Sequence, residues 1–258
     1  MAVPILSVKS LTMRFGGLLA VDDVSFDLFP DQILAIIGPN GAGKTSVFNV
    51  VTGMYIATAG EILFQGKSIN NSQPHHIAAL GMKRTFQQSR LFNNLSILDN
   101  ILVGMAAKAS GDLIKAVLRR DLLRKELKKD IAYALDLLGY FSKEMRGNYF
   151  KRASDLPPGD RRKLEICRAL ASDPKALLLD EPAAGMDPGE TTELMNDIMK
   201  IRTLRSGIGI ILIEHDMSVV RKTADHVLVL AHGKVIATGS FDAVASDPGV
   251  QEAYLGTV

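Results

Sequence analysis

Hydrophobic and polar positions alternate near the start of the chain, which is the pattern of strands with one buried face. Ile5–Phe15 and Val21–Leu28 are predicted to be two such strands, and Gly60–Phe64 another. Ile33–Ile37 is short and wholly apolar, which predicts a strand buried on both faces. Met82–Phe86 is a further predicted strand.

The middle of the chain has a helical period instead. Between Ile97 and Leu138, apolar residues recur at spacings of three and four. Within it, Arg119–Asp130 mixes basic with acidic side chains, which favours a solvated, ion-paired helix face over a nucleic-acid or lipid surface. We therefore predict an inserted helical subdomain at about residues 89–160.

Helices and apolar strands alternate again after this insert. The predicted helices are Arg161–Ser172 and Glu190–Arg205, and the predicted strands are Ala176–Leu179, Ile208–Ile213 and Val227–Leu230. Such alternation predicts a mostly parallel sheet covered on both faces. The expected fold class is α/β, in a single domain over residues 1–258 whose core comprises about 1–88 and 161–258.

Composition and charge narrow the function classes. The 258 residues include 30 Lys and Arg against 28 Asp and Glu, a net charge of +2, which argues against a protein that holds nucleic acid mainly through phosphates. The single cysteine, Cys167, excludes an internal disulfide and a zinc site of four cysteines. The chain has neither a signal-peptide pattern at its start nor an apolar run of about 18 residues, so we expect any membrane span to belong to another chain.

The strongest chemical motif lies between a predicted strand and a predicted helix. It reads Gly38-Pro39-Asn40-Gly41-Ala42-Gly43-Lys44-Thr45, which fits the phosphate-loop pattern at every fixed position. Glycines let backbone N–H groups surround a phosphate, and the following helix directs its positive end at the same anion. Lys44 is predicted to neutralise the β- and γ-phosphates, and the Thr45 hydroxyl to bind Mg²⁺.

Two further predicted strands end in candidate catalytic side chains. Asp180 and Glu181 follow an apolar strand, at the sheet edge where a parallel fold gathers its ligands. Asp180 is expected in the Mg²⁺ shell, and Glu181 is expected to orient or deprotonate the attacking water. His215, after the next apolar strand, is expected to sense the γ-phosphate, although a lone histidine is more often structural.

Together these residues resemble the nucleotide-binding subunit of an ABC transporter, over essentially the whole chain. The resemblance implies a P-loop NTPase of the ABC type, with an antiparallel β subdomain and a helical subdomain, that binds ATP and Mg²⁺. The implied ATP-binding residues are Phe15, as an adenine-stacking aromatic, and Gly38, Pro39, Asn40, Gly41, Ala42, Gly43, Lys44, Thr45 and Ser46. Gln87 resembles the Q-loop glutamine. The resemblance therefore implies that Gln87 binds Mg²⁺ together with Thr45 and Asp180. It also implies that Gln87 is a catalytic residue, as Glu181 and His215 are. Asp187 falls in the D-loop.

The segment at the position of the family signature departs from the usual Leu-Ser-Gly-Gly-Gln. Its residues are Leu156, Pro157, Pro158, Gly159 and Asp160. By resemblance, they contact ATP held by a second copy. We expect Gly159 and the N–H groups of the helix opening at Asp160 to make that contact, with Asp160 capping the helix.

Within the superfamily, the chain is most similar to the ATP-binding subunits of branched-chain amino acid importers. The stretches that carry this similarity are Arg84-Thr85-Phe86-Gln87, Arg90-Leu91-Phe92, Leu164-Glu165-Ile166, Leu212-Ile213-Glu214-His215-Asp216-Met217 and Ala253-Tyr254-Leu255-Gly256. The resemblance implies a homodimer or a heterodimer with a related ATPase, two membrane permeases, an extracytoplasmic solute-binding protein and no nucleic acid. It places the chain peripherally on the cytoplasmic face of the inner membrane, with residues 87–94 expected to dock the permeases.

Other functions stay open at this point. An ATPase of urea or amide import, or of lipopolysaccharide export, fits the same motifs. A GTPase usually shows an Asn-Lys-x-Asp stretch, and no Asn-Lys occurs in the chain. A module that holds ATP without turnover would not need Glu181 and His215. ABC proteins that act on ribosomes typically have two ATPase units in one chain, and those that act on DNA usually have a coiled-coil or zinc insertion.

Overall fold

The computed structural model describes residues 3–87, 89–106 and 120–255, and the chain divides into two compact units. The first unit comprises residues up to Gln87 and from Lys175 onward, and the second comprises Gln88–Pro174. The second unit thus continues through residues 161–174, which the sequence analysis grouped with the core. None of the helices in the described ranges is long and apolar enough to cross a bilayer.

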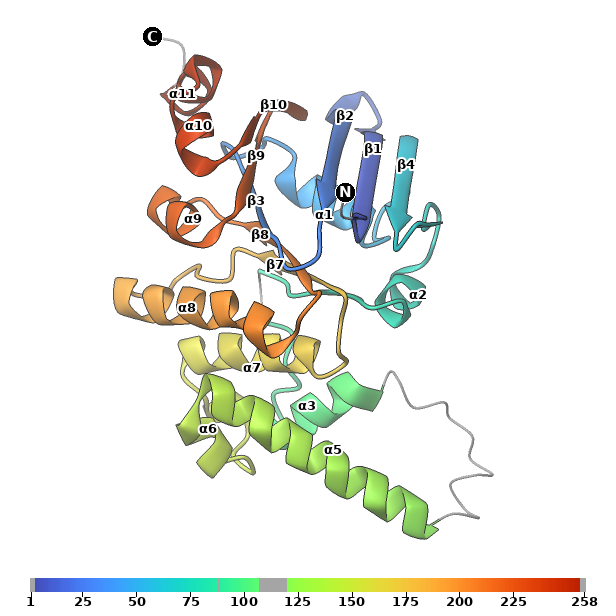
Figure 1. The fold of residues 1–258 in the computed structure, drawn as a ribbon, viewed down its shortest axis with the longest axis vertical. Helices are drawn as coiled ribbons and strands as arrows, with labels where there is room; N and C mark the ends of the chain where they lie inside the picture. Colours follow the sequence, from blue (N-terminus) through green and yellow to red (C-terminus); the bar gives the residue numbers. More distant parts are fainter. Residues whose placement is uncertain (1–2, 88, 107–119, 256–258) are drawn as a thin grey trace. The chain divides into compact units, whose positions relative to one another are not determined.

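The first unit contains an antiparallel sheet of four strands, visible in part in Figure 1. Its order is β2 (Leu18–Leu28), β1 (Leu6–Phe15), β4 (Ala59–Phe64) and β5 (Lys67–Ser68). Both long strands are irregular, with Ser10 and Asp23 at positive φ of 48° and 54°. The register shift between Val8 and Leu11 changes which positions of β1 face inward, so that Leu11 and Met13 face the core as Leu6 and Val8 do.

The second sheet of this unit has six strands and is the predicted, mostly parallel one. Its order is β10 (Lys234–Gly239), β9 (His226–Ala231), β3 (Ile33–Ile37), β8 (Gly209–Ile213), β7 (Ala176–Asp180) and β6 (Met82–Arg84). Only the edge strand β10 runs antiparallel to its neighbour. The central strands β3, β7 and β8 are buried at every residue, which explains why their sequences are apolar up to Asp180 at the end of β7.

Helices cover both faces of the six-stranded sheet. They are α1 (Lys44–Val51), α2 (Pro74–Ala79), α8 (Pro188–Leu204), α9 (Met217–Thr223), α10 (Phe241–Ala245) and α11 (Pro248–Leu255). Leu34 and Ile36 of β3 share a core with α1 and the four-stranded sheet. Ala35 and Ile37 point the other way, into a core with α9, α10 and α11. Helices α2, α9, α10 and α11 were not predicted from the sequence, because segments this short carry little periodicity.

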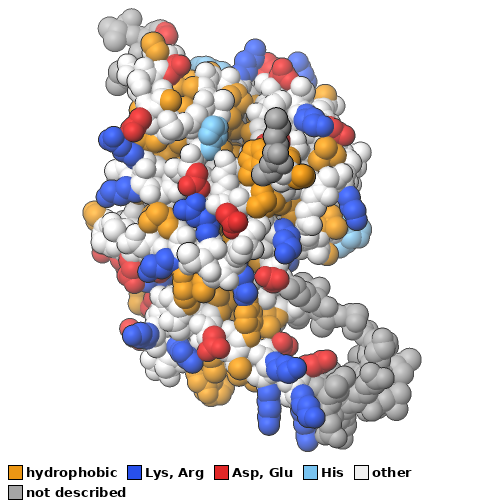
Figure 2. Space-filling view, in the orientation of Figure 1, with side chains coloured by type: hydrophobic (Ala, Val, Ile, Leu, Met, Phe, Trp, Pro, Cys, Tyr) orange, Lys and Arg blue, Asp and Glu red, His pale blue; other side chains and the backbone are white. Residues whose placement is uncertain are grey.

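The second unit is mainly helical. It contains α3 (Ile97–Ala106), α5 (Arg120–Phe141), α6 (Lys143–Gly147), a 3₁₀ turn η1 (Ala153–Asp155) and α7 (Pro158–Leu170). Residues 107–119 of the predicted helical stretch, which include Arg119 of the charged segment, lie outside the described residues. On α5, side chains 124–129 are exposed, so the charged segment is a solvated helix face over the part that the structure describes (Figure 2).

The start of α7 corrects one expectation. The helix begins at Pro158 with Pro157 as its N-cap, so Asp160 lies inside the first turn and does not occupy the cap position. Proline is well suited to the first helical position, because its missing N–H would have no partner within the helix and its φ is already helical. The two prolines therefore start the helix earlier than expected.

Candidate nucleotide-binding site

The phosphate-loop motif connects β3 to α1, and two of its glycines are required by close backbone approaches. Gly38 has φ 149°, and a Cβ there would lie 2.0 Å from the carbonyl oxygen of Leu230 on β9. Gly43 has φ 102°, and its Cβ would lie 2.5 Å from the carbonyl oxygen of Ala20 on β2. Any side chain at either position would displace the neighbouring backbone.

Lys44 lies at the first position of α1 and is buried. Its Nζ donates to the carbonyl oxygens of Gly38 and Pro39, at 2.8 and 3.0 Å, which folds the side chain back along the loop. Burial lowers the pKa of Lys44, while the nearby carboxylates of Glu181 and Asp180 act to raise it. The ammonium group is thus directed at the centre of the loop, where a phosphate would lie.

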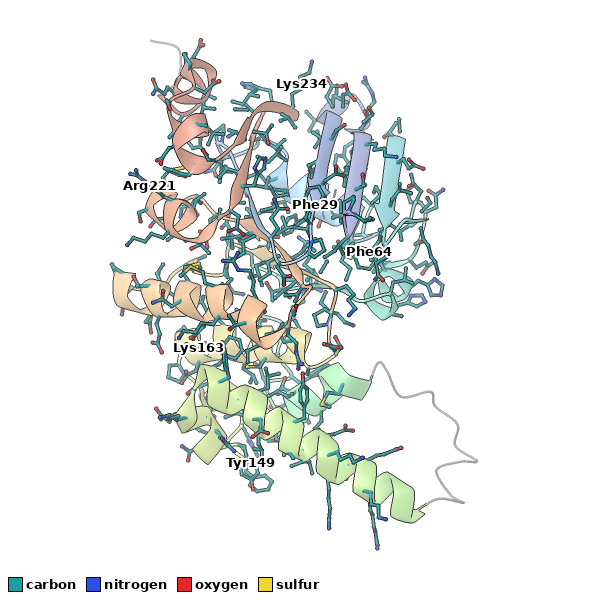
Figure 3. All side chains as sticks on the ribbon, in the orientation of Figure 1. Phe29, Phe64, Tyr149, Lys163, Arg221 and Lys234 are labelled. Atoms are coloured by element: carbon teal, nitrogen blue, oxygen red, sulfur yellow. The ribbon has the colours of Figure 1, made fainter. Side chains whose placement is uncertain are left out.

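The turn between β9 and β10 braces the loop against the four-stranded sheet. Gly233 donates its N–H to Ala42 at 3.0 Å and accepts from the Asp22 N–H at 2.8 Å. Lys234, labelled in Figure 3, pairs with the Asp22 carboxylate at 3.2 Å. Because one turn binds both elements, the β1–β2 hairpin is held over the phosphate loop.

These elements enclose a cleft with a volume of about 490 Å³. It is lined by Phe15, Leu18, Leu19, Ala20, Asn40 to Ser46, Glu181, His232 and Gly233. Phe15 is 38% exposed and packs edge-on against Tyr55, with ring centroids 5.1 Å apart. The cleft therefore combines an accessible aromatic face with a loop of backbone N–H donors, which suits a purine nucleotide. No sequence motif marks five of these lining residues, so they could not be predicted: Leu18, Leu19, Ala20, His232 and Gly233.

Glu181 follows β7 with a strained backbone, at φ 46°. Its N–H donates to Ile213 at 3.0 Å, and its Oε2 accepts from Nε2 of Gln87 at 2.9 Å. The structure thus brings together two predicted catalytic residues that are far apart in sequence, and Glu181 also reaches the cleft. A carboxylate held at this point has the placement that a general base for water needs.

Asp180, the last residue of β7, is engaged by an arginine that the sequence analysis did not assign to the site. Nη2 of Arg84 lies 2.7 Å from Oδ2 of Asp180, and both side chains are only 7% exposed. The signal was present in the sequence, since Arg84 opens the stretch Arg84-Thr85-Phe86-Gln87. No residue near that stretch in the sequence indicates that Arg84 pairs with Asp180.

The end of β8 supplies a buried carboxylate and an exposed histidine. Glu214 accepts from the Ala183 N–H at 3.2 Å, and burial is the main reason why its pKa is raised. His215 is 65% exposed, with Nδ1 3.9 Å from Oε2 of Glu214, and it is not among the residues that line the cleft. The structure therefore places Glu214, which the sequence analysis did not assign, as a support for the loop after Glu181.

The structure gives Asp187 a local role and shows which residues of the signature segment are buried. Asp187 caps α8, accepting from the N–H groups of Gly189 and Glu190 at 2.7 and 2.9 Å in a capping box. In the second unit, Leu156 and Gly159 are buried, whereas Pro157 and Pro158 are exposed.

The residues present fit ATP and Mg²⁺. A loop that tolerates no side chain at Gly38 and Gly43 leaves its backbone free to approach an anion closely. Proteins usually bind magnesium through one or two carboxylates together with the phosphates of the substrate. One aspartate and one hydroxyl are therefore enough ligands from the protein. Asp180 and Thr45 would supply that pair.

The ends of β3, β8 and β7, neighbours in one sheet, thus bring the phosphate loop and the carboxylates of Asp180 and Glu181 to one edge of the sheet, with His215 after β8 outside the cleft. This fold and site define a P-loop nucleotide hydrolase. A family model described as ABC transporter matches residues 21–184, and one described as branched-chain amino acid ATP-binding cassette transporter matches residues 234–258. The chain belongs to the ABC transporter family, as a nucleotide-binding ATPase subunit of a transporter with membrane components.

Named relatives agree with this assignment. The high-affinity branched-chain amino acid transport ATP-binding protein LivG of Escherichia coli strain K12 is 40% identical over 256 residues, covering 99% of both chains. BraF of Pseudomonas aeruginosa, described in the same words, is 39% identical with the same coverage. The solved ADP conformation of MJ1267, an ATP-binding cassette of an ABC transporter, has a TM-score of 0.83 at 31% identity, covering 99% of this chain and 100% of that one.

Proposed function

We propose that this chain couples ATP hydrolysis to the import of branched-chain amino acids. The observation that carries the hydrolytic part is the cleft in which the phosphate loop and Glu181 meet. The solute is supported by LivG and BraF, whose names state branched-chain amino acid transport and which match this chain along 99% of its length. An importer of urea or amides, or a lipopolysaccharide exporter, is the alternative.

The residues divide the work of hydrolysis as follows. The N–H groups of the loop and the ammonium of Lys44 bind the β- and γ-phosphates, while Phe15 stacks on the adenine. Thr45, Asp180 and Gln87 would hold Mg²⁺, which, when bound, would neutralise charge on the phosphate oxygens. Glu181 takes a proton from the attacking water, and its hydrogen bond from Gln87 fixes the orientation of the carboxylate.

The other partners complete the proposed cycle. Two copies, or one copy and a related ATPase, close over ATP, with Leu156, Pro157, Pro158, Gly159 and Asp160 of one contacting the nucleotide of the other. His215 contacts the γ-phosphate, and Asp187 belongs to the D-loop. Two permeases and an extracytoplasmic solute-binding protein supply the transport path, which places this chain peripherally at the cytoplasmic face of the membrane.

Two variants test the hydrolytic proposal. Lys44→Ala is expected to lose ATP binding, because it removes the cation directed at the phosphates. Glu181→Gln is expected to bind ATP as the wild type does, to lose about a hundredfold or more in turnover, and to form an ATP-dependent dimer in gel filtration. Near-normal hydrolysis by either variant contradicts the assignment.

The solute is tested separately, in vesicles that contain the permeases and the binding protein purified with this chain. ATP-driven uptake of labelled leucine, competed by isoleucine and valine but not by urea, supports the proposal. Uptake of urea or an amide alone favours the alternative. The Glu181→Gln complex serves as the control for uptake that does not depend on hydrolysis.

A further inference from the structure

Arg84 joins the two halves of the nucleotide site through a buried hydrogen-bond network. It is the last residue of β6, which pairs in parallel with β7, and Asp180 is the last residue of β7. Nη2 donates to Oδ2 of Asp180 at 2.7 Å, and Nη1 donates to Oδ1 of Asn49 at 2.7 Å and to Oγ1 of Thr52 at 3.3 Å. One guanidinium group thus binds the end of a strand and the helix that follows the phosphate loop.

The packing around Arg84 leaves this group little freedom. Its guanidinium carbon lies 5.3 Å from the ring centroid of Phe48 and 5.1 Å from that of Phe86, both cation–π distances. Nε is buried and has no hydrogen-bond partner in the described structure. Leaving a buried donor without a partner has a free-energy cost, so the geometry is maintained by its other contacts.

The contacts on α1 lie on the helix face that also carries Thr45. Thr45, Asn49 and Thr52 are spaced by four and three residues, which places them on one side of a helix. Arg84 therefore bonds directly to Asp180 and to the side of α1 that bears Thr45. Asp180 and Thr45 are two of the three residues that the proposed function assigns to Mg²⁺.

We propose that Arg84 is a positioning residue for the metal part of the site, an inference that rests on the proposed function. By holding one carboxylate oxygen, Arg84 keeps Asp180 in a single orientation relative to α1 and leaves the other oxygen to the metal. A planar fork can bond Asn49 and Asp180 at once, which a lysine ammonium cannot do in the same geometry. Removal of such supporting hydrogen bonds typically weakens metal binding by about 10- to 100-fold.

Two other roles make different predictions. If Arg84 only stabilises the fold, its loss lowers the melting temperature but leaves metal affinity unchanged. If its positive charge competes with the metal for Asp180, its loss tightens metal binding. Metal affinity measured apart from activity separates all three roles.

The experiment measures Mn²⁺ binding to the full-length, ATP-loaded protein by electron paramagnetic resonance, with ATP affinity in EDTA determined in parallel. Arg84→Met is expected to weaken Mn²⁺ binding about tenfold or more while ATP affinity in EDTA stays within about twofold. Arg84→Lys is expected to behave like the methionine variant, because charge without the fork does not orient Asp180. Asn49→Ala removes the shorter of the two hydrogen bonds of Nη1 and leaves the one to Thr52. It is expected to weaken Mn²⁺ binding about threefold and is available should Arg84→Met fail to fold.

Arg202→Met is the matched control. It breaks another arginine–aspartate pair of the same unit, Arg202 with Asp225, also 2.7 Å long, and should leave Mn²⁺ binding unchanged. Mn²⁺ affinity of Arg84→Met within about twofold of the wild type, tighter binding, or full rescue by Arg84→Lys would overturn the positioning role. A wild-type chain that binds no ATP would instead overturn the proposed function, so the two failures are distinct.

Discussion

Glu214 shows how one buried side chain links pH to the stability of the catalytic loop. Its carboxylate is 1% exposed and accepts a hydrogen bond from Ala183, two residues after Glu181. Burial raises the pKa of Glu214, and the Glu181 carboxylate acts in the same direction. The folded state therefore holds this proton to higher pH than the unfolded chain does.

The sign of the resulting pH dependence follows from linkage. Between about pH 4.3, where an unperturbed glutamate ionises, and the raised pKa of the folded state, the folded state binds more protons at this site than the unfolded state, so stability falls as pH rises through this range. Glu214→Gln keeps an oxygen to accept from Ala183 and removes the ionisation. We expect the variant to lose less stability than the wild type between pH 5 and pH 8, measured by urea unfolding.

Asp216 provides a control of opposite sign. Hydrogen bonds from Ser218 are the main reason why the pKa of Asp216 is lowered. Ionised Asp216 stabilises the fold above the ordinary pKa of aspartate, and this stabilisation is lost as pH falls. The difference in unfolding free energy between the wild type and Asp216→Asn should therefore shrink as the pH is lowered. A Glu214→Gln variant with the same pH profile as the wild type contradicts the role of burial.

At the scale of elements, side chains of α7 bind the backbone of Arg90, near the start of the helical unit. Glu165 on α7 accepts from the Arg90 N–H at 2.6 Å and from Nη1 of Arg162 at 2.8 Å. Arg168, one turn on, donates to the Arg90 carbonyl oxygen at 2.7 Å. Both backbone groups of Arg90 are thus bound by side chains of the helix that begins at the signature segment.

Glu165→Ala should therefore destabilise the protein strongly. The substitution removes a carboxylate that is 3% exposed and leaves Arg162 and the Arg90 amide without this acceptor, at a cost of about 3 kcal/mol. Asp136→Ala, which breaks the exposed pair of Asp136 with Arg146, should cost about 0.5 kcal/mol or less. Equal effects of the two variants in urea unfolding would show that Glu165 has no special role.

At the scale of the whole molecule, the proposed transport cycle requires a surface that docks the permeases. The sequence analysis placed it at residues 87–94, of which Gln88 lies outside the described residues. Leu91 is buried, whereas Phe92 is 48% exposed with Arg168 over its ring at 5.8 Å. Phe92 is thus the apolar side chain of this stretch that is available to a partner, and Leu91 is part of the core.

Phe92→Asp should uncouple transport from hydrolysis. In the reconstituted complex, uptake is expected to fall about tenfold or more, as when an interface anchor is lost, while the ATPase rate of the isolated chain stays within about twofold. Leu127→Asp, at an exposed apolar position on α5, is the matched control and should leave uptake unchanged. Wild-type uptake by Phe92→Asp, or crosslinks from this stretch that never reach a permease, would contradict the docking surface.

The sequence by itself determined the parts of the site that depend on neighbouring residues. The phosphate loop, the apolar strands before it and before Asp180, and the helix after it were all predicted, because their function requires fixed residue types at fixed short spacings. The mostly parallel sheet followed from strands too apolar to have an exposed face. The start of α7 was misplaced because two prolines in a turn and at a helix start look alike in sequence.

Only the tertiary structure decided which distant residues complete these motifs. The pairs Arg84 with Asp180, Gln87 with Glu181 and Ala42 with Gly233 join segments that sheet order brings together. Leu18 and His232 line the cleft with side chains that carry no chemical motif. Such contacts depend on strand register and close packing between layers, and a single sequence specifies these only through the energy of the whole fold.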